Sequence, residues 1–451
     1  MKKQVSVIDI TMLIAIFISP FKDIFILKVG LVDFKLPQVI WSVVFLLMII
    51  KRLEKKYTCS SINFEEINNN LIFSIYLGML AISWLFSVDM NQSTKEIIQY
   101  IYFFAAMYAV YFKSKNKDFM ELVIKTFIFS NIVMISVAII SIIVGKSIVP
   151  TITALSNGQI FLDFELFSSQ QLMETGDTIN RITIMGLGPI GISFYIILQS
   201  LLINYKIRVT EGKTKKLFIL LLLANSIIIV MGYSRIGILI FFLLNVFTLF
   251  SKDHVKNIGI FFLTIAGAVL FLLLVPEVFL RILETFNTEE QSSRYHFVFW
   301  IIALKTGYNN ILSGIGLGNM LYSAGNNKEL FDSFGLYETT IVPTHNFVLQ
   351  IWSEQGIFGI LINMVLLFVP VIYYVNARFL RKTIEAKSVY FFIVLAFIGM
   401  VTYNLTNNSY YIEIFWEYIG LMYAMKYHLT KDGNLLLKKY IPLHSQQKII
   451  S

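Results

Sequence analysis

Long apolar runs separated by short polar segments are the feature that most constrains this chain. About 20 mostly apolar residues are enough to cross a bilayer as a helix. Because backbone in lipid must satisfy its own hydrogen bonds, such runs favour spanning helices, and we expect an all-α integral membrane protein with about 12 of them. The expected spans are residues 7–27, 36–50, 71–88, 97–112, 119–144, 182–205, 217–232, 236–250, 258–275, 346–374, 389–406 and 411–427.

The composition excludes several other classes. Hydrophobic residues make up 57% of the chain and charged residues 14%, whereas about 25% of the residues in a soluble domain are charged. An outer-membrane barrel would show short alternating segments, which are missing here. The net charge of +9 is explained by basic cytoplasmic loops, so we expect no nucleic acid partner.

The distribution of Lys and Arg predicts the orientation of the chain. With the N-terminus in the cytoplasm and the spans alternating, inside segments carry 25 of these residues and outside segments carry 11. Cytoplasmic loops are enriched in Lys and Arg. We therefore expect both termini in the cytoplasm and treat residues 1–451 as one polytopic domain.

Two outer loops are unusually long, 145–181 and 276–345. Loops of this length are usually functional or disordered. The second lies between the ninth and tenth predicted helices and contains aromatic residues, Gly turns and amphipathic stretches, of which 295–306 reads as a helix. We expect this large outer loop to fold onto the membrane surface.

Four arginines lie in the predicted outer loops or at their membrane edges: Arg181, Arg235, Arg281 and Arg294. A guanidinium group offers a planar fork of donors that fits phosphate oxygens. Several arginines at this boundary would suit a lipid-linked diphosphate. The alternative is that each arginine snorkels or pairs with an acidic loop residue.

His345 lies where the large loop enters the tenth helix, and Asn346, Gln350 and Glu354 follow it at intervals of four. This spacing puts the three polar side chains on one side of a helix, where they are costly in a membrane unless they face a cavity or the bundle interior. A neutral histidine can accept a proton near neutral pH. The alternative is a capping histidine followed by a stripe that serves helix packing.

Other signals are weaker. The glycine pattern of 314–318 has no strand before it, so a flexible turn is the preferred reading over nucleotide binding. His296 is only two residues from Arg294, and a helix would splay the two side chains apart. No His, Cys, Asp or Glu cluster has the spacing of metal ligands, so we expect no metal. The single cysteine, Cys59, excludes an internal disulfide.

The second half of the chain resembles the O-antigen polymerase and O-antigen ligase superfamily of bacterial envelope proteins. The stretches that carry the resemblance are Ser234-Arg-Ile-Gly, Ser293-Arg-Tyr-His-Phe-Val-Phe-Trp, Gly314-Ile-Gly-Leu-Gly-Asn and Thr344-His-Asn-Phe-Val-Leu-Gln-Ile-Trp-Ser-Glu-Gln-Gly-Ile-Phe-Gly. The last stretch is the most specific. The family's usual Pro-Asn pair after the middle arginine is replaced here by Gly188-Pro-Ile.

The resemblance implies a glycosyltransferase that needs neither metal nor cofactor. Its donor would be an undecaprenyl-diphosphate-linked glycan, used on the outer face of the bacterial cytoplasmic membrane. His345 resembles the family's essential histidine, and Arg294 and Arg181 resemble its arginines; these three are the predicted catalytic residues. The predicted substrate-binding residues are Arg235, Asn346, Gln350, Glu354 and Tyr295.

Polymerisation of glycan repeat units into O-antigen, capsular or exopolysaccharide is the favoured function. One alternative is a ligase that transfers finished glycan to lipid A-core or another acceptor. An alternative of another class is a lipid-linked glycan flippase or transporter, against which the absence of an internal repeat argues. The expected partners are the lipid-linked donor, the glycan acceptor, the bilayer and a chain-length regulator protein.

Overall fold

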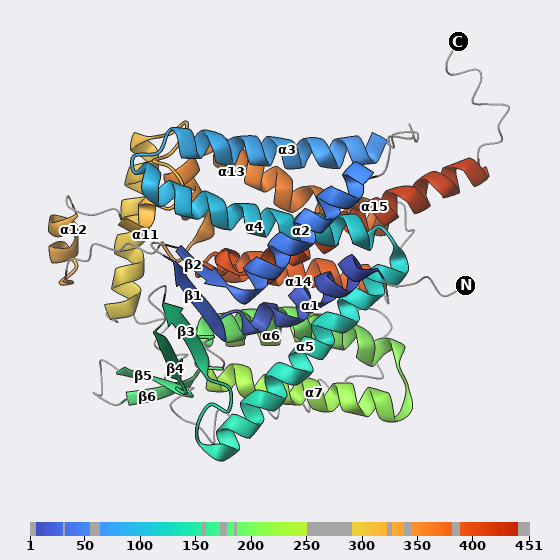
Figure 1. The fold of residues 1–451 in the computed structure, drawn as a ribbon, viewed down its shortest axis with the longest axis horizontal. Helices are drawn as coiled ribbons and strands as arrows, with labels where there is room; N and C mark the ends of the chain where they lie inside the picture. Colours follow the sequence, from blue (N-terminus) through green and yellow to red (C-terminus); the bar gives the residue numbers. More distant parts are fainter. Residues whose placement is uncertain are drawn as a thin grey trace, which may run out of the picture.

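The computed structural model describes residues 6–29, 32–54, 64–155, 159–171, 178–184, 187–249, 291–322, 327–337, 344–380 and 388–440. Within these ranges, long helices that run in similar directions form a bundle, and small sheets lie at one end of it (Figure 1). The helices are α1 (Val7–Ile18), α2 (Leu36–Glu54), α3 (Phe64–Leu85), α4 (Met90–Ser114), α5 (Lys117–Val144), α6 (Pro189–Val209), α7 (Gly212–Met231), α8 (Arg235–Leu249), α11 (Gln291–Asn309), α12 (Lys328–Ser333), α13 (Phe347–Val375), α14 (Val389–Asn404) and α15 (Glu413–Tyr440). Short helical turns are η1 (Ser19–Phe21), η4 (Asn319–Tyr322), η5 (Asn376–Leu380) and η6 (Ser409–Tyr411).

The observed helices agree with the hydropathy pattern. A helix lies at each predicted span except the ninth, 258–275, which falls outside the described residues. By length and composition α5, α6, α7 and the continuous helix Phe347–Arg378 could each cross a membrane, and shorter apolar helices accompany them. The helix predicted over 295–306 is α11. The chain is therefore a helical membrane protein.

The first and sixth spans need correction. The first helix ends at Ile18 and is followed by η1, because Pro20 has no backbone N–H to continue the ladder. The residues from Phe25 onward, predicted to complete the span, form a strand. At the sixth span Ile182 ends a strand, and the helix begins at Pro189, a position where proline's fixed φ suits the first turn.

Two small sheets qualify the predicted all-α fold. The strands are β1 (Phe25–Val29), β2 (Val32–Lys35), β3 (Thr151–Leu155), β4 (Ile160–Asp163), β5 (Phe167–Gln171) and β6 (Thr178–Ile182). One sheet has the order β2-β1-β3-β4, with β1 parallel to β3 and the other pairs antiparallel, and the second is a hairpin of β5 and β6. Both sheets lie at the end of the bundle that also carries α11 and α12, which we call the sheet end (Figure 1).

The described part of the large loop has a core of its own, and its helix α11 packs against α13. The residues of this second apolar cluster are Val298, Phe299, Ile302, Ala303, Met320, Phe331 and Leu336. Burying apolar side chains between α11, η4 and α12 fixes these segments relative to one another. The loop therefore presents a defined surface at the sheet end.

Helix α15 runs through the centre of the bundle. Its Trp416 stacks on Phe103 of α4, with ring centroids 5.8 Å apart and an interplanar angle of 7°. A Cβ at Gly420 would lie 2.3 Å from the carbonyl oxygen of Met107, so only glycine permits this approach of α15 to α4. The buried Glu417 accepts hydrogen bonds from Ser19 Oγ and from an indole N–H of α2.

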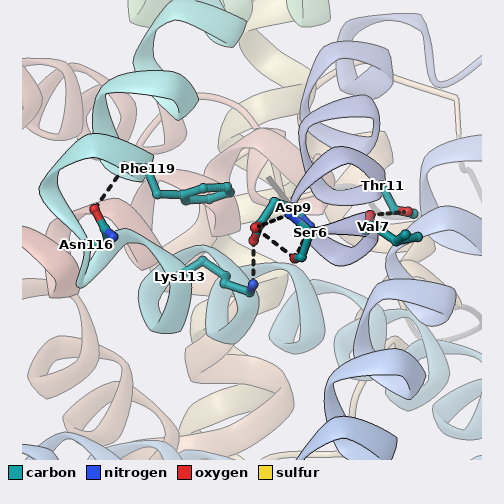
Figure 2. A network of polar contacts seen from close by, with 7 residues as sticks. All are labelled: Ser6, Val7, Asp9, Thr11, Lys113, Asn116 and Phe119. Carbon is teal, nitrogen blue, oxygen red and sulfur yellow. Dashed lines mark hydrogen bonds and ion pairs between the residues drawn. The ribbon is translucent and has the colours of Figure 1, made fainter. Parts of the chain in front are cut away.

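A polar network closes the opposite end of the bundle (Figure 2). Ser6 and Asp9 form a capping box at the start of α1, and Lys113 near the end of α4 pairs with Asp9. Asn116 caps α5 through the N–H groups of its first turn. The start of α1 and the end of α15 lie at this same end (Figure 1), and its cytoplasmic orientation stays a prediction.

Candidate functional site

His345 occupies a strained position at the sheet end, immediately before α13. Its φ of 48° lies in the left-handed region, which side chains other than glycine rarely adopt. Such a conformation costs on the order of 1–3 kcal/mol and persists only where the surroundings impose it. The strain makes His345 a candidate functional residue independently of its sequence context.

The residue before His345 is fixed by hydrogen bonds from two helices. The carbonyl of Thr344 accepts a hydrogen bond from Trp300 Nε1 of α11 at 2.9 Å. Its hydroxyl donates to Gln350 Oε1 at 2.7 Å, and Gln350 Nε2 donates to Glu354. Gln350 and Glu354 are fully buried, so these two members of the predicted polar stripe face the bundle interior, and Gln350 contacts the residue next to His345.

Asn346 fixes the backbone on the other side of His345. Its side-chain oxygen accepts hydrogen bonds from the N–H groups of Val348 at 3.0 Å and Leu349 at 3.1 Å. These donors have no partner within the helix, so the contact caps α13. The capping role that the sequence offered as an alternative for His345 therefore belongs to Asn346, which leaves the imidazole available.

The surroundings of the His345 side chain favour its neutral form. Burial lowers the pKa of His345 below its ordinary value of 6.5. Its ring meets the ring of His296 with centroids 4.5 Å apart and an interplanar angle of 60°. A neutral imidazole at pH 7 keeps a nitrogen lone pair, which is what a general base requires.

A break in α13 lies about three turns beyond His345. At Gly356 the backbone has φ 64° and ψ −160°, which interrupts the helix. The carbonyls of Ser353 and Glu354 accept hydrogen bonds from the N–H groups of Ile315 and Gly316, both at 2.9 Å. The interruption thus frees backbone acceptors that bind the glycine turn to the helix.

The turn at 314–318 is packed, in contrast to the flexible turn expected from the sequence. A Cβ at Gly314 would lie 2.2 Å from the backbone carbon of Glu354, and one at Gly316 would lie 2.5 Å from Cα of Ser87. Both glycines also have positive φ. Glycine is required because two backbone segments touch here, a role that the sequence pattern could not reveal.

Arg294 and Tyr295 stabilise the far side of α11. Arg294 Nη1 donates to the carbonyl of Phe334 at 3.2 Å, and Tyr295 Oη donates to the carbonyl of Tyr337 at 3.1 Å. Both side chains are partly exposed. They lie in the same loop assembly as His345 but on a different face of α11 from His296.

Arg181 and Arg235 are brought together elsewhere in the fold. Arg181, on β6, donates from Nε to the carbonyl of Gly232 at 3.2 Å. Gly232 precedes Arg235, the first residue of α8, by three positions. The fourth outer arginine, Arg281, lies outside the described residues.

The end of α14 and the segment that follows it connect the two groups of predicted residues. Tyr403 hydrogen-bonds Ser234, the neighbour of Arg235, at 3.3 Å. Asn408 lies 3.5 Å from the hydroxyl of Thr344, the neighbour of His345. The sequence analysis did not select Tyr403 or Asn408, because nothing local to them indicates contact with residues so distant in the chain.

The described residues hold no group of three or more His, Cys, Asp or Glu side chains that could bind a metal ion. A family model described as O-antigen ligase matches residues 218–364. The matched segment includes Arg235, Arg294, the glycine turn, His345 and the break in α13. A comparison with curated proteins found no match. Over this segment, the chain is similar to the O-antigen ligase and polymerase superfamily.

Proposed function

We propose that this protein polymerises undecaprenyl-diphosphate-linked oligosaccharide repeat units into O-antigen, capsular or exopolysaccharide. The reaction would take place on the outer face of the bacterial cytoplasmic membrane, the side to which we assign the sheet end. The observation that carries the proposal is His345: a half-buried imidazole with a lowered pKa, held in strained backbone within the segment of family similarity.

In the proposed reaction His345 takes the proton of an acceptor sugar hydroxyl. The hydroxyl oxygen forms a bond to the anomeric carbon of the donor as the bond from that carbon to the diphosphate breaks, and undecaprenyl diphosphate leaves. A positioned general base contributes about 10²- to 10⁴-fold in rate, or roughly 3–5 kcal/mol of barrier. The strained backbone of His345 is consistent with such preorganisation.

Arg294, Arg181 and Arg235 are assigned to the diphosphate. The leaving group gains negative charge as its bond to the sugar breaks, and preorganised cationic donors stabilise such charge. A guanidinium can donate two parallel hydrogen bonds to a phosphate, which a lysine cannot. The partly exposed Arg181, Arg235 and Arg294 can each offer donors at the protein surface.

The other predicted substrate-binding residues fall into two groups, one partly exposed and one buried. Asn346 and Tyr295 are partly exposed and are proposed to contact the glycan. Gln350 and Glu354 are fully buried and hydrogen-bonded to each other. We assign these two to holding Thr344, and through it the backbone of His345, so that they affect the substrate indirectly.

Transfer of finished glycan to a separate acceptor is the second candidate, because the matching family model is described as O-antigen ligase. Both reactions use the same base and the same leaving group. They differ in the acceptor, which is a lipid-linked glycan in the polymerase and another anchor in the ligase. The size and the anchor of the glycan product therefore distinguish them.

The test uses cells that lack the gene, complemented with wild type, His345→Ala or His428→Ala. His428 is the control: a buried histidine whose ring hydrogen-bonds the Ser114 carbonyl at 2.9 Å, near the opposite end of the bundle. We expect single repeat units at the surface without the gene or with His345→Ala, and full ladders with wild type and His428→Ala. Membrane-fraction levels of each variant verify insertion.

Each other outcome has a distinct meaning. Long chains that stay on the undecaprenyl carrier would indicate a ligase. Absence of any lipid-linked glycan at the outer face would indicate a transporter. A full ladder from His345→Ala would refute the proposed role of the histidine.

A further inference from the structure

One face of α11 contacts the His345 segment with three side chains. His296, Phe299 and Trp300 are spaced by three and four residues, which places them on the same side of a helix. His296 meets the His345 ring at 4.5 Å between centroids, and Phe299 lies 6.4 Å from it. Trp300 holds the carbonyl of Thr344. This face of α11 therefore packs against His345, the predicted base, and against the backbone next to it.

In the sequence, the candidate partner of His296 was its near neighbour Arg294. Arg294 hydrogen-bonds the Phe334 carbonyl, and a spacing of two residues on a helix predicts that its side chain and that of His296 diverge. The relevant partner of His296 is instead His345, which is distant in the sequence and reaches it only in the fold.

The hydrogen bonds to the backbone around His345 do not fix the orientation of its ring, which depends on the side chains packed against it. Thr344 and Asn346 fix the main chain on either side of His345. The imidazole itself still has rotatable χ angles, which aromatic neighbours restrict. The edge-to-face contact with His296, at an interplanar angle of 60°, is the closest ring contact of His345 among the described residues. Such aromatic contacts prefer defined geometries.

We propose that His296 is a positioning residue for glycosyl transfer, whose ring holds the imidazole of His345 in the orientation that accepts the proton. The inference rests on the proposed function, in which His345 is the base. A misplacement of about 1 Å at a reacting group can cost on the order of 10²-fold in rate. His296 therefore acts through the rate of the chemical step, and donor binding does not depend on it.

The experiment uses the purified full-length protein in lipid nanodiscs with an undecaprenyl-diphosphate-linked repeat unit as substrate. The variants are His296→Ala, His296→Phe, His345→Ala, the double variant of both alanine changes, and Tyr308→Ala. Tyr308 is the matched control, an aromatic residue of α11 whose side chain is 72% exposed. The measured quantities are kcat and KM for each variant, with the thermal unfolding midpoint as a check of folding.

His296→Ala is expected to lower kcat about 10- to 100-fold with KM for the donor unchanged. His296→Phe, which keeps a planar ring, is expected to recover most of the lost rate, and Tyr308→Ala to behave as wild type. Because His296 acts only through His345, the double variant is expected to be no slower than His345→Ala alone.

Three results would overturn the inference. They are an unchanged kcat in His296→Ala, a His296→Phe variant as slow as His296→Ala, and a double variant slower than His345→Ala. The third comparison stays decisive if His296→Ala lowers stability. Activity in His345→Ala would refute the proposed function itself, whereas an inactive His345→Ala with a fully active His296→Ala would refute the positioning role alone.

Discussion

Replacing Gly314 by alanine tests whether the glycine turn holds α13 at its break. The new Cβ would lie 2.2 Å from the backbone carbon of Glu354, a distance that no side-chain rotation relieves. The turn must therefore move away from the helix. Movement weakens the hydrogen bonds from Ile315 to Ser353 and from Gly316 to Glu354.

The magnitude follows from two contributions. Alanine at the positive φ of Gly314 costs about 1–2 kcal/mol. Each of the two weakened hydrogen bonds is worth about 0.5–1.5 kcal/mol, and their acceptors lie at buried residues. We expect Gly314→Ala to lower the free energy of unfolding by about 2–5 kcal/mol.

Gly212→Ala is the matched control. Gly212 also has a positive φ, 62°, but no atom lies within 4 Å of the Cβ it would gain. The Gly212→Ala variant should lose only about 1–2 kcal/mol of unfolding free energy, which is the cost of alanine at a positive φ. The assay is unfolding of the purified protein in mixed micelles by increasing fractions of denaturing detergent, followed by circular dichroism. Equal losses in the two variants would refute the claim that close packing, and not backbone conformation alone, requires glycine in the turn.

Four further predictions concern the site. Because burial lowers the pKa of His345 below 6.5, its neutral form persists to lower pH, and the acidic limb of the rate profile should lie below pH 6.5; a limb above that value would contradict the assignment. The same shift should lower the free energy of unfolding as the pH falls below about 6.5, since the unfolded chain then binds the proton more readily. Arg294→Lys should reduce polymer yield strongly while Lys305→Arg, on the same helix, does not, as judged by glycan ladders. Glu354→Ala should cost about 1–3 kcal/mol more unfolding free energy than Glu354→Gln, because alanine leaves the buried Gln350 amide without its acceptor; equal costs in denaturation would exclude that role.

The helices were predictable because their signal is local. Apolar runs such as 119–144 and 389–406 coincide with α5 and α14 to within a few residues. The sheets were not, because β1 pairs with β3 more than a hundred residues later in the chain. Short strands next to apolar helices carry no periodicity that separates them from a helix end.

The site was predictable in part for the same reason. The stripe from Asn346 to Glu354 follows from helical spacing within one segment, and in the structure its members Gln350 and Glu354 face the bundle interior, whereas Asn346 is partly exposed. The contact between His296 and His345 depends on how α11 packs on α13. One local sign was present, since His296 and Trp300 are four apart on a predicted helix. The sequence does not show that this face of α11 packs against the start of α13, so the spacing alone did not indicate a contact with His345.

The central position of α15 has a consequence for biosynthesis. About 300 residues separate the end of α4 from the start of α15, and at 5–20 residues per second they take roughly 15–60 s to make. During that interval Ser19 and Phe103 have been synthesised, but Glu417 and Trp416, which they contact, have not. The early helices must therefore wait in the bilayer as an incomplete assembly. A nascent chain interrupted at the start of α15 is expected to be a substrate for membrane quality-control proteases, even though every segment of the proposed catalytic site, including the connection through Asn408, has already been made.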